Sequence, residues 1–144
     1  MPEGLVVAST TADVSSTVVA LADVTQLAVT LEANCTYEVD CWIQFTSAVT
    51  TTGLQLGYAA PNATLAFLEI MVSLRNTAST ASVQHLLFPA AAQANNGVVI
   101  GTGVSVINSP HSARISGILK VGTTGGTFVP RFAAEIAATS VTIK

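Results

Sequence analysis

An alternation of apolar and polar residues over positions 35–45 constrains the fold more than any other feature of this chain. The odd positions carry Cys, Tyr, Val, Cys, Ile and Phe, and the even positions carry Thr, Glu, Asp, Trp and Gln. Successive side chains of a β-strand point to opposite faces, so the pattern predicts a strand with one face in a core. Trp42 interrupts the polar face. A large aromatic there is typical of an interface, and a lone surface tryptophan is the simpler alternative.

The rest of the chain contains shorter segments of the same kind, separated by turn residues such as the Gly-Thr-Thr-Gly-Gly run at 122–126. We therefore expect about eight or nine short strands, the pattern of an antiparallel β-sandwich. The other predicted strands lie at residues 26–31, 54–58, 64–74, 82–88, 97–107, 113–121, 127–136 and 140–143. Alternation predicts two further sets of inward-facing side chains, which are Ile115, Leu119 and Val121 in one strand and Phe128, Phe132 and Ile136 in another.

The segment 64–74 differs from the other predicted strands because it is apolar on both faces. A short buried helix is an open alternative, since the same residues also allow helical spacing. We favour a strand that has one face in the core and the other against a neighbouring subunit. Phe67 and Met71 of this segment are therefore candidate interface residues, together with Trp42.

The composition supports an assembly. Half of the residues are hydrophobic and only 9% are charged, whereas an ordinary soluble domain has about 25% charged residues. The two long uncharged stretches are interrupted by Pro, Gly and Asn, so neither resembles the run of about 20 apolar residues that spans a membrane. We expect much of the outer surface to be covered by copies of the chain or by a larger assembly, which favours a structural protein over an enzyme.

The first residues are predicted to form an extended N-terminal arm, residues 1–16, ahead of a single sandwich domain, residues 17–144. The arm is rich in Ser, Thr and Ala, which offer little surface to offset the entropy cost of ordering. We expect it to become ordered only on binding a neighbouring molecule. Leu5, Val6 and Val7 are candidate interface residues, because they could add a short strand to another sheet. The first residues lack a basic region followed by an apolar core, so we expect no signal peptide.

Charge and cysteine content limit the partners and cofactors. The net charge is −3, and the five basic residues form no cluster, so binding to nucleic acid is not expected. Cys35 and Cys41 lie about 20 Å apart if they share a strand, too far for a disulfide. We expect two free, inward-facing thiols. The two His and two Cys lack the spacing of a zinc site, and no cofactor is expected.

No catalytic motif is complete, so we expect no enzymatic activity. Glu38 and Asp40 share one strand face about 7 Å apart, which suits either a glycosidase pair or a solvated face. The solvated face is favoured, and pairing with an arginine such as Arg114 of another subunit is an open alternative. Folding could bring His85 or His111 near Asp40, but a lone histidine on an apolar strand is more often a core or interface residue, and we favour that role for both.

Two stretches resemble a widespread group of tailed-bacteriophage virion proteins. The first covers residues 21–61 and includes Thr-Tyr-Glu-Val at 36–39 and a Thr-rich turn that ends in Thr-Thr-Gly at 51–53. The second covers residues 113–136 and 141–144 and includes the Gly-rich segment 117–127, followed by a Phe-to-Glu segment at 128–135. The resemblance therefore rests on strand and turn residues over about half of the chain.

The resemblance implies a jelly-roll sandwich similar to the trimeric tumour-necrosis-factor shape, and it carries no catalytic residues. It implies a role in the phage particle, as a head decoration (cement) protein, a head fibre or the tip of a tail fibre. The sequence shows no shaft, which favours a decoration protein. Our hypothesis is a homotrimer that binds the phage major capsid protein on the outer surface of the capsid. The alternative is a receptor- or glycan-binding tip.

Overall fold

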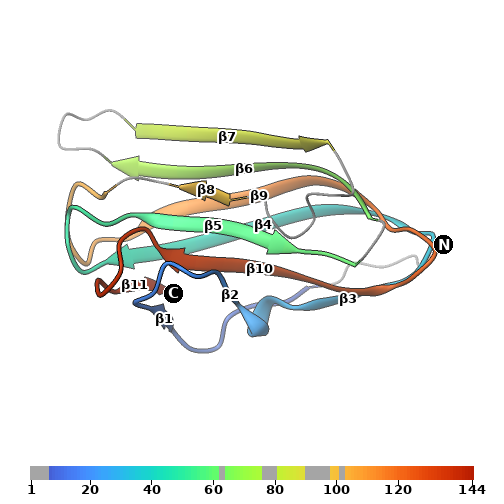
Figure 1. The fold of residues 1–144 in the computed structure, drawn as a ribbon, viewed down its shortest axis with the longest axis horizontal. Helices are drawn as coiled ribbons and strands as arrows, with labels where there is room; N and C mark the ends of the chain where they lie inside the picture. Colours follow the sequence, from blue (N-terminus) through green and yellow to red (C-terminus); the bar gives the residue numbers. More distant parts are fainter. Residues whose placement is uncertain (1–6, 62–63, 76–80, 90–97, 101–102) are drawn as a thin grey trace.

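The chain folds as an all-β sandwich of antiparallel sheets, as predicted (Figure 1). The computed structural model describes residues 7–61, 64–75, 81–89, 98–100 and 103–144. These residues contain one short 3-10 helix, η1 (Thr25–Leu27), and no α-helix. The strands are β1 (Val14–Ser16), β2 (Ala22–Asp23), β3 (Val29–Leu31), β4 (Thr36–Ser47), β5 (Leu54–Ala59), β6 (Leu65–Arg75), β7 (Ala81–Pro89), β8 (Val98–Ile100), β9 (His111–Lys120), β10 (Gly126–Ala134) and β11 (Val141–Ile143).

The chain crosses repeatedly between the two layers. One sheet has the strand order β1-β11-β4-β9-β6-β7, and the other has the order β2-β10-β5-β8, with β3 also paired to β10. From β4 onward, each strand lies in the opposite sheet from the one before it, except for the hairpin of β6 and β7. Strands that are neighbours in space are therefore mostly distant in sequence.

The core forms where the inward-facing side chains of the two sheets meet. The alternation in β4 places Ile43 and Phe45 inward, and both are buried. The segment predicted at 64–74 is a strand, and its even-numbered positions Ala66, Leu68, Ile70 and Val72 are fully buried. Ile115, Leu119, Val121, Phe128 and Phe132 are buried as predicted, so alternation identified the inward faces of these strands.

The strand predicted at 97–107 is wrong in its second half. β8 ends at Ile100, and residues 103–107 belong to a bend and a turn. Gly103 has a φ of +69°, and a Cβ built there would lie 2.7 Å from the carbonyl oxygen of Thr50. Val104 is buried, but Val106 and Ile107 are exposed. Their alternating apolar pattern therefore arises in a loop that passes close to residue 50.

Ile136 also differs from its prediction. β10 ends at Ala134, and Ile136 is 45% exposed in the turn that follows. Alternation loses its meaning once a strand ends, because the backbone no longer directs side chains to opposite faces. The predicted strand at 26–31 is likewise shorter, since residues 25–27 form η1 and only Val29–Leu31 pair with β10.

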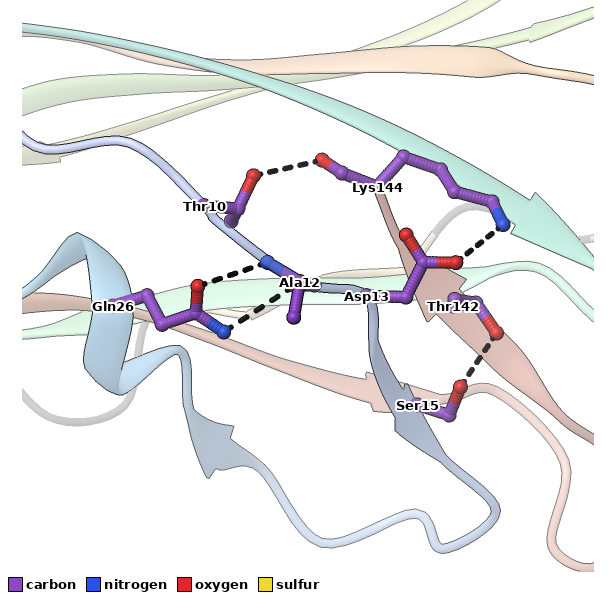
Figure 2. A network of polar contacts seen from close by, with 7 residues as sticks. All are labelled: Thr10, Ala12, Asp13, Ser15, Gln26, Thr142 and Lys144. Carbon is purple, nitrogen blue, oxygen red and sulfur yellow. Dashed lines mark hydrogen bonds and ion pairs between the residues drawn. The ribbon is translucent and has the colours of Figure 1, made fainter.

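Residues 10–16 of the predicted arm lie against the sandwich. β1 pairs with β11, so that Val14 is opposite Ile143 and Ser16 is opposite Val141. The side-chain amide of Gln26 accepts a hydrogen bond from the main-chain N–H of Ala12 and donates one to its carbonyl, both at 3.3 Å (Figure 2). The same side-chain oxygen also accepts a hydrogen bond from the main-chain N–H of Thr11 at 2.6 Å. The structure therefore differs from the expectation that this part becomes ordered only on binding.

Three more polar contacts hold the same segment to the other end of the chain. The Thr10 hydroxyl donates to the carbonyl of Lys144 at 3.1 Å, and Asp13 forms an ion pair with the Lys144 ammonium at 2.6 Å (Figure 2). The hydroxyls of Ser15 and Thr142 lie 2.7 Å apart. Residues 1–6 of the arm, including Leu5 and Val6, lie outside the described residues.

Cys35 and Cys41 are free, as predicted, and both are half-buried rather than enclosed in the core. Burial, followed by the neighbouring charge of Asp40, raises the pKa of the Cys41 thiol to about 11. Tyr37 lies between the two cysteines on the same face of β4, and its hydroxyl accepts a hydrogen bond from the main-chain N–H of Glu32 at 2.8 Å. This face of β4 is therefore only partly covered towards its N-terminal end.

Candidate interaction surface

Among the side chains that the structure describes, the exposed large apolar residues that lie on strands are gathered on the outer face of the larger sheet. The register of β4, β9 and β6 aligns their outward-facing residues in three rows across the sheet. We call this set the outer-face patch, and its rows are Trp42–Arg114–Met71, Asp40–Ser116–Glu69 and Glu38–Ile118–Phe67. Side chains directly opposite one another on neighbouring strands lie close enough to form one continuous surface.

Large apolar side chains occupy both ends of the outer-face patch. Trp42 is 62% exposed, Phe67 is 51% exposed and Ile118 is 41% exposed, while Met71 is partly buried. Single exposed apolar residues are common on monomers, but a contiguous group on one face is typical of an interaction site. The inner faces of the same strands fill the core, so the outer-face patch is available to bind another molecule.

The polar part of the outer-face patch is organised around Arg114. Its guanidinium donates two hydrogen bonds to the Asp40 carboxylate, at 2.7 and 2.9 Å, and lies 4.7 Å from the centre of the Trp42 ring. Hydrogen bonding to Arg114 holds the pKa of Asp40 below its usual value, and the same contact raises the pKa of Arg114. Trp42 is therefore held in place by a cation–π contact with a side chain that is itself fixed.

The two carboxylates share one face, as expected, and Arg114, the arginine considered as a partner in the open alternative, lies on the neighbouring strand of the same chain. Asp40 forms an ion pair with Arg114 of its own chain. Glu38 lies two residues before Asp40 on β4. Asp40 is therefore held in its ionised form, whereas a glycosidase acid needs a raised pKa to donate a proton. The arrangement matches the expected solvated face.

The predicted interface residues divide into two groups. Trp42, Phe67 and Met71 come from separate strand positions and lie together in the outer-face patch. Val7, from the N-terminal segment, is 74% exposed, and Leu5 and Val6 lie outside the described residues. The sequence analysis does not name Ile118 as an interface residue. Ile118 is an even-numbered position of the same strand as Arg114 and Ser116, which are predicted to face outward, and this could have identified it.

His111 lies away from Asp40. His111 is buried, with its ring 5.5 Å from that of Phe45 and its Nε2 atom 3.4 Å from the carbonyl oxygen of Val106. On β9 it pairs with Phe45, whereas Asp40 pairs with Ser116. His85 lies opposite Met71 in the backbone register of β7 and β6. Among the described residues, no three His, Cys, Asp or Glu side chains gather closely enough to hold a metal ion.

Comparisons with known proteins do not identify the chain. No protein-family model, no characterised protein and no solved structure matches it. Over the described ranges, no helix has the length and apolar character needed to cross a membrane. The resemblance to phage virion proteins therefore stays a prediction, and the outer-face patch is the feature of the structure that bears most directly on function.

Proposed function

We propose that the chain is a structural protein of a tailed-bacteriophage particle, and specifically a capsid decoration protein. It assembles as a homotrimer and binds the major capsid protein on the outer surface of the head. The observation that carries this proposal is the outer-face patch, where Trp42, Phe67 and Ile118 are exposed on a chain with only 9% charged residues. In the trimer, this face packs against neighbouring copies and removes its apolar area from water.

The strand order supports the jelly-roll form of the sandwich that the resemblance implies. A jelly roll is a double-sheet arrangement built from Greek-key connections. Here the orders β1-β11-β4-β9 and β2-β10-β5-β8 interleave the first and last strands of the chain in both sheets. The hairpin of β6 and β7 then extends the sheet that carries the outer-face patch.

The exposure of Trp42 favours a second candidate, the receptor- or glycan-binding tip of a fibre. Aromatic rings with neighbouring polar groups suit binding sites that must fix the orientation of a ligand. One side of the Trp42 ring faces Arg114, so a sugar would have to use the remaining surface. We favour the decoration protein because Phe67 and Ile118 lie two rows from Trp42 and would have no role in such a site.

The oligomer is tested by placing charges in the outer-face patch. Light scattering should give three times the 14.7 kDa chain mass for the unaltered protein. Phe67→Glu combined with Ile118→Glu should give a folded monomer, because buried unpaired carboxylates are costly. The matched control is Val18→Glu with Val106→Glu, which changes two valines that are about as exposed but lie in loops. A monomeric unaltered protein would contradict the trimer, and dissociation of the control alone would contradict the outer-face patch as its interface.

The role in the particle is tested with heads of the phage that encodes the chain, prepared without it. The protein should co-sediment with these heads and raise the temperature at which they release DNA. Binding to host cells or to isolated surface glycans, with no binding to heads, would instead support the fibre tip. A neighbouring major capsid gene is expected for the decoration protein, and a neighbouring baseplate or tail gene for the tip.

A further inference from the structure

Loops at one end of the sandwich carry a second group of exposed apolar side chains. The group comes from three loops that are far apart in the chain, and its members are Val18, Val19, Val106, Ile107 and Ile136. Each of the five is between 45% and 56% exposed. This end lies on the left in Figure 1, where β4 leads into β5 and β10 leads into β11. The outer-face patch, by contrast, lies on the strands themselves.

Main-chain hydrogen bonds join these loops to one another and to the turn between β4 and β5. The donor and acceptor residues are Ala138 with Thr17 at 2.8 Å, Ala48 with Ser140 at 3.0 Å and Val104 with Thr50 at 3.0 Å. We call the four joined segments the loop end, and they are residues 17–20, 48–53, 103–110 and 135–140. Because each segment is fixed to another, the loop end is preorganised, which lowers the entropy cost of binding a folded partner.

The loop end is almost without charge. Glu135 is the one charged residue in the sequence of the four segments. Its carboxylate accepts hydrogen bonds from the main-chain N–H groups of Gly53 at 2.8 Å and Gly103 at 3.0 Å. A charged partner would lose its hydration at such a surface without gaining an ion pair in return. The loop end is therefore complementary to an uncharged, partly apolar surface.

The composition of the loop end favours a protein partner over a membrane. Surfaces that bind lipid at the interface use residues such as Trp and Phe, and they use Lys and Arg to attract anionic headgroups. The four segments contain no aromatic and no basic residue. Their exposed apolar side chains are those of Val and Ile, which suit close packing against the surface of another folded protein.

A trimeric decoration protein needs two binding surfaces, one for its own copies and one for the shell. In the proposed function the outer-face patch packs against the copies, so the shell requires another surface. The loop end lies at the ends of the strands, where it stays accessible when the outer face of the sheet is covered. A three-fold axis running along the strands would place three loop ends on one side of the trimer, and three weak contacts to one particle give tight binding.

We propose that the loop end is the surface that binds the capsid shell. Its exposed Val and Ile side chains pack against an uncharged apolar region of the major capsid protein. This inference rests on the proposed function, and it assigns the shell to a surface separate from the one that forms the trimer.

Co-sedimentation with heads prepared without the protein tests the assignment. Val18→Glu combined with Val106→Glu should remain a folded trimer by circular dichroism and light scattering. It should bind heads at least about ten-fold more weakly, because binding would bury two unpaired carboxylates. The matched control is Thr30→Glu with Thr124→Glu, which adds the same charge at exposed positions near the other end of β10. The control should bind heads as well as the unaltered protein does.

The salt dependence of binding tests the chemistry of the contact. The affinity of the unaltered protein for heads should change by less than about two-fold between about 50 mM and about 500 mM sodium chloride, since salt screens contacts between charges. A steep loss of affinity over this range would show that ion pairs hold the protein to the shell and would overturn the proposed contact.

The remaining outcomes separate this inference from the proposed function. Undiminished head binding by the Val18→Glu, Val106→Glu variant would overturn the inference and leave the decoration role intact, and dissociation of that variant would place the loop end in the trimer interface instead. Failure of the unaltered protein to bind heads would contradict both. Binding to vesicles of phosphatidylcholine and phosphatidylglycerol that is lost in the same variant would assign the loop end to a membrane.

Discussion

At the scale of single residues, Glu135 connects two loops at one end of the sandwich. One carboxylate oxygen accepts hydrogen bonds from the main-chain N–H groups of Gly53 at 2.8 Å and Gly103 at 3.0 Å. The main-chain N–H of Glu135 donates to the carbonyl of Gly53 at 3.1 Å. The loop that replaces the end of the predicted strand at 97–107 is therefore fixed to β10 and to the turn before β5.

Glu135→Gln should lower the free energy of unfolding by about 1–3 kcal/mol, because hydrogen bonds to a charged acceptor are stronger than those to an amide. Denaturant unfolding at a fixed protein concentration measures the change. Glu32→Gln is the matched control, since Glu32 is exposed, and it should alter stability by less than about 0.5 kcal/mol. Equal effects of the two substitutions would show that the loops do not depend on this carboxylate.

Cys41 gives a prediction about alkaline pH. Burial raises the pKa of its thiol from 9.0 to about 11, so between these values the unfolded chain releases a proton that the folded chain retains. The folded state then binds more protons, and stability falls as pH rises from about 9 to about 11. Unfolding measured across this range should show a smaller loss in Cys41→Val than in the unaltered protein.

Cys35→Ser serves as the control for the alkaline prediction, because it retains Cys41 and should keep the full loss. Burial also raises the pKa of Tyr58, to about 12, and this contribution is present in both variants. Its effect therefore cancels when the two are compared at the same pH. An identical alkaline loss in Cys41→Val and Cys35→Ser would contradict the prediction.

At the scale of elements, β9 depends on a glycine in the centre of the larger sheet. Gly117 has a φ of +139°, and a Cβ built there would lie 2.1 Å from the carbonyl oxygen of Phe67 on β6. Gly117→Ala should therefore destabilise the protein by at least about 2 kcal/mol, through backbone strain and separation of the strands. Ser112→Ala, an exposed position on the same strand, is the control. Thermal unfolding of both variants measures the difference.

The segment before β1 depends on Gln26. Gln26→Ala removes the hydrogen bonds to Thr11 and Ala12, so hydrogen exchange at these two amides should accelerate about ten-fold with little change in overall stability. Gln44→Ala, an exposed glutamine on β4, should leave their exchange unchanged. If Gln26→Ala had no effect on exchange, the pairing of β1 with β11 would be sufficient to hold the segment.

Elements with a buried face and a solvent face could be predicted from the sequence. β4 and β9 show period-two sequence patterns because one face of each packs in the core, whereas β6 is apolar on both faces and alternates only in burial. The apolar residues of the loop at 103–107 alternate, so the sequence predicts a strand there. The conformation of this loop instead depends on Gly103 and on its contact with residue 50, which is far away in the sequence. Short edge strands such as β1 carry no pattern of their own and exist through pairing with β11.

The outer-face patch could be predicted only in part. The sequence identifies Trp42 and Phe67 separately. Trp42 interrupts the polar face of its strand, and Phe67 belongs to a strand that is apolar on both faces. Their arrangement with Ile118 depends on the register of three strands that are far apart in the chain. The alternation of side chains along β9 is enough to place Ile118 on the outer face. It does not show that Ile118 lies beside Phe67.

At the scale of the whole molecule, the strand order predicts slow folding. β1 pairs with β11, and β4 pairs with β9, so most sheet contacts close long loops of chain. Domains dominated by such contacts fold in about milliseconds to seconds, more slowly than helical proteins of similar size. Stopped-flow refolding of the unaltered protein should show a main phase in this range. A microsecond phase with full amplitude would contradict the prediction.

The position of β11 has a consequence for synthesis in the cell. β11 lies between β1 and β4 and hydrogen-bonds to both, yet it follows all the other strands of the described residues in chain order. Until it emerges, the nascent chain carries unpaired edges on two strands that were made much earlier, and such edges can pair with other nascent chains. The interval between the translation of β4 and that of β11 is therefore the stage at which this protein most needs a chaperone.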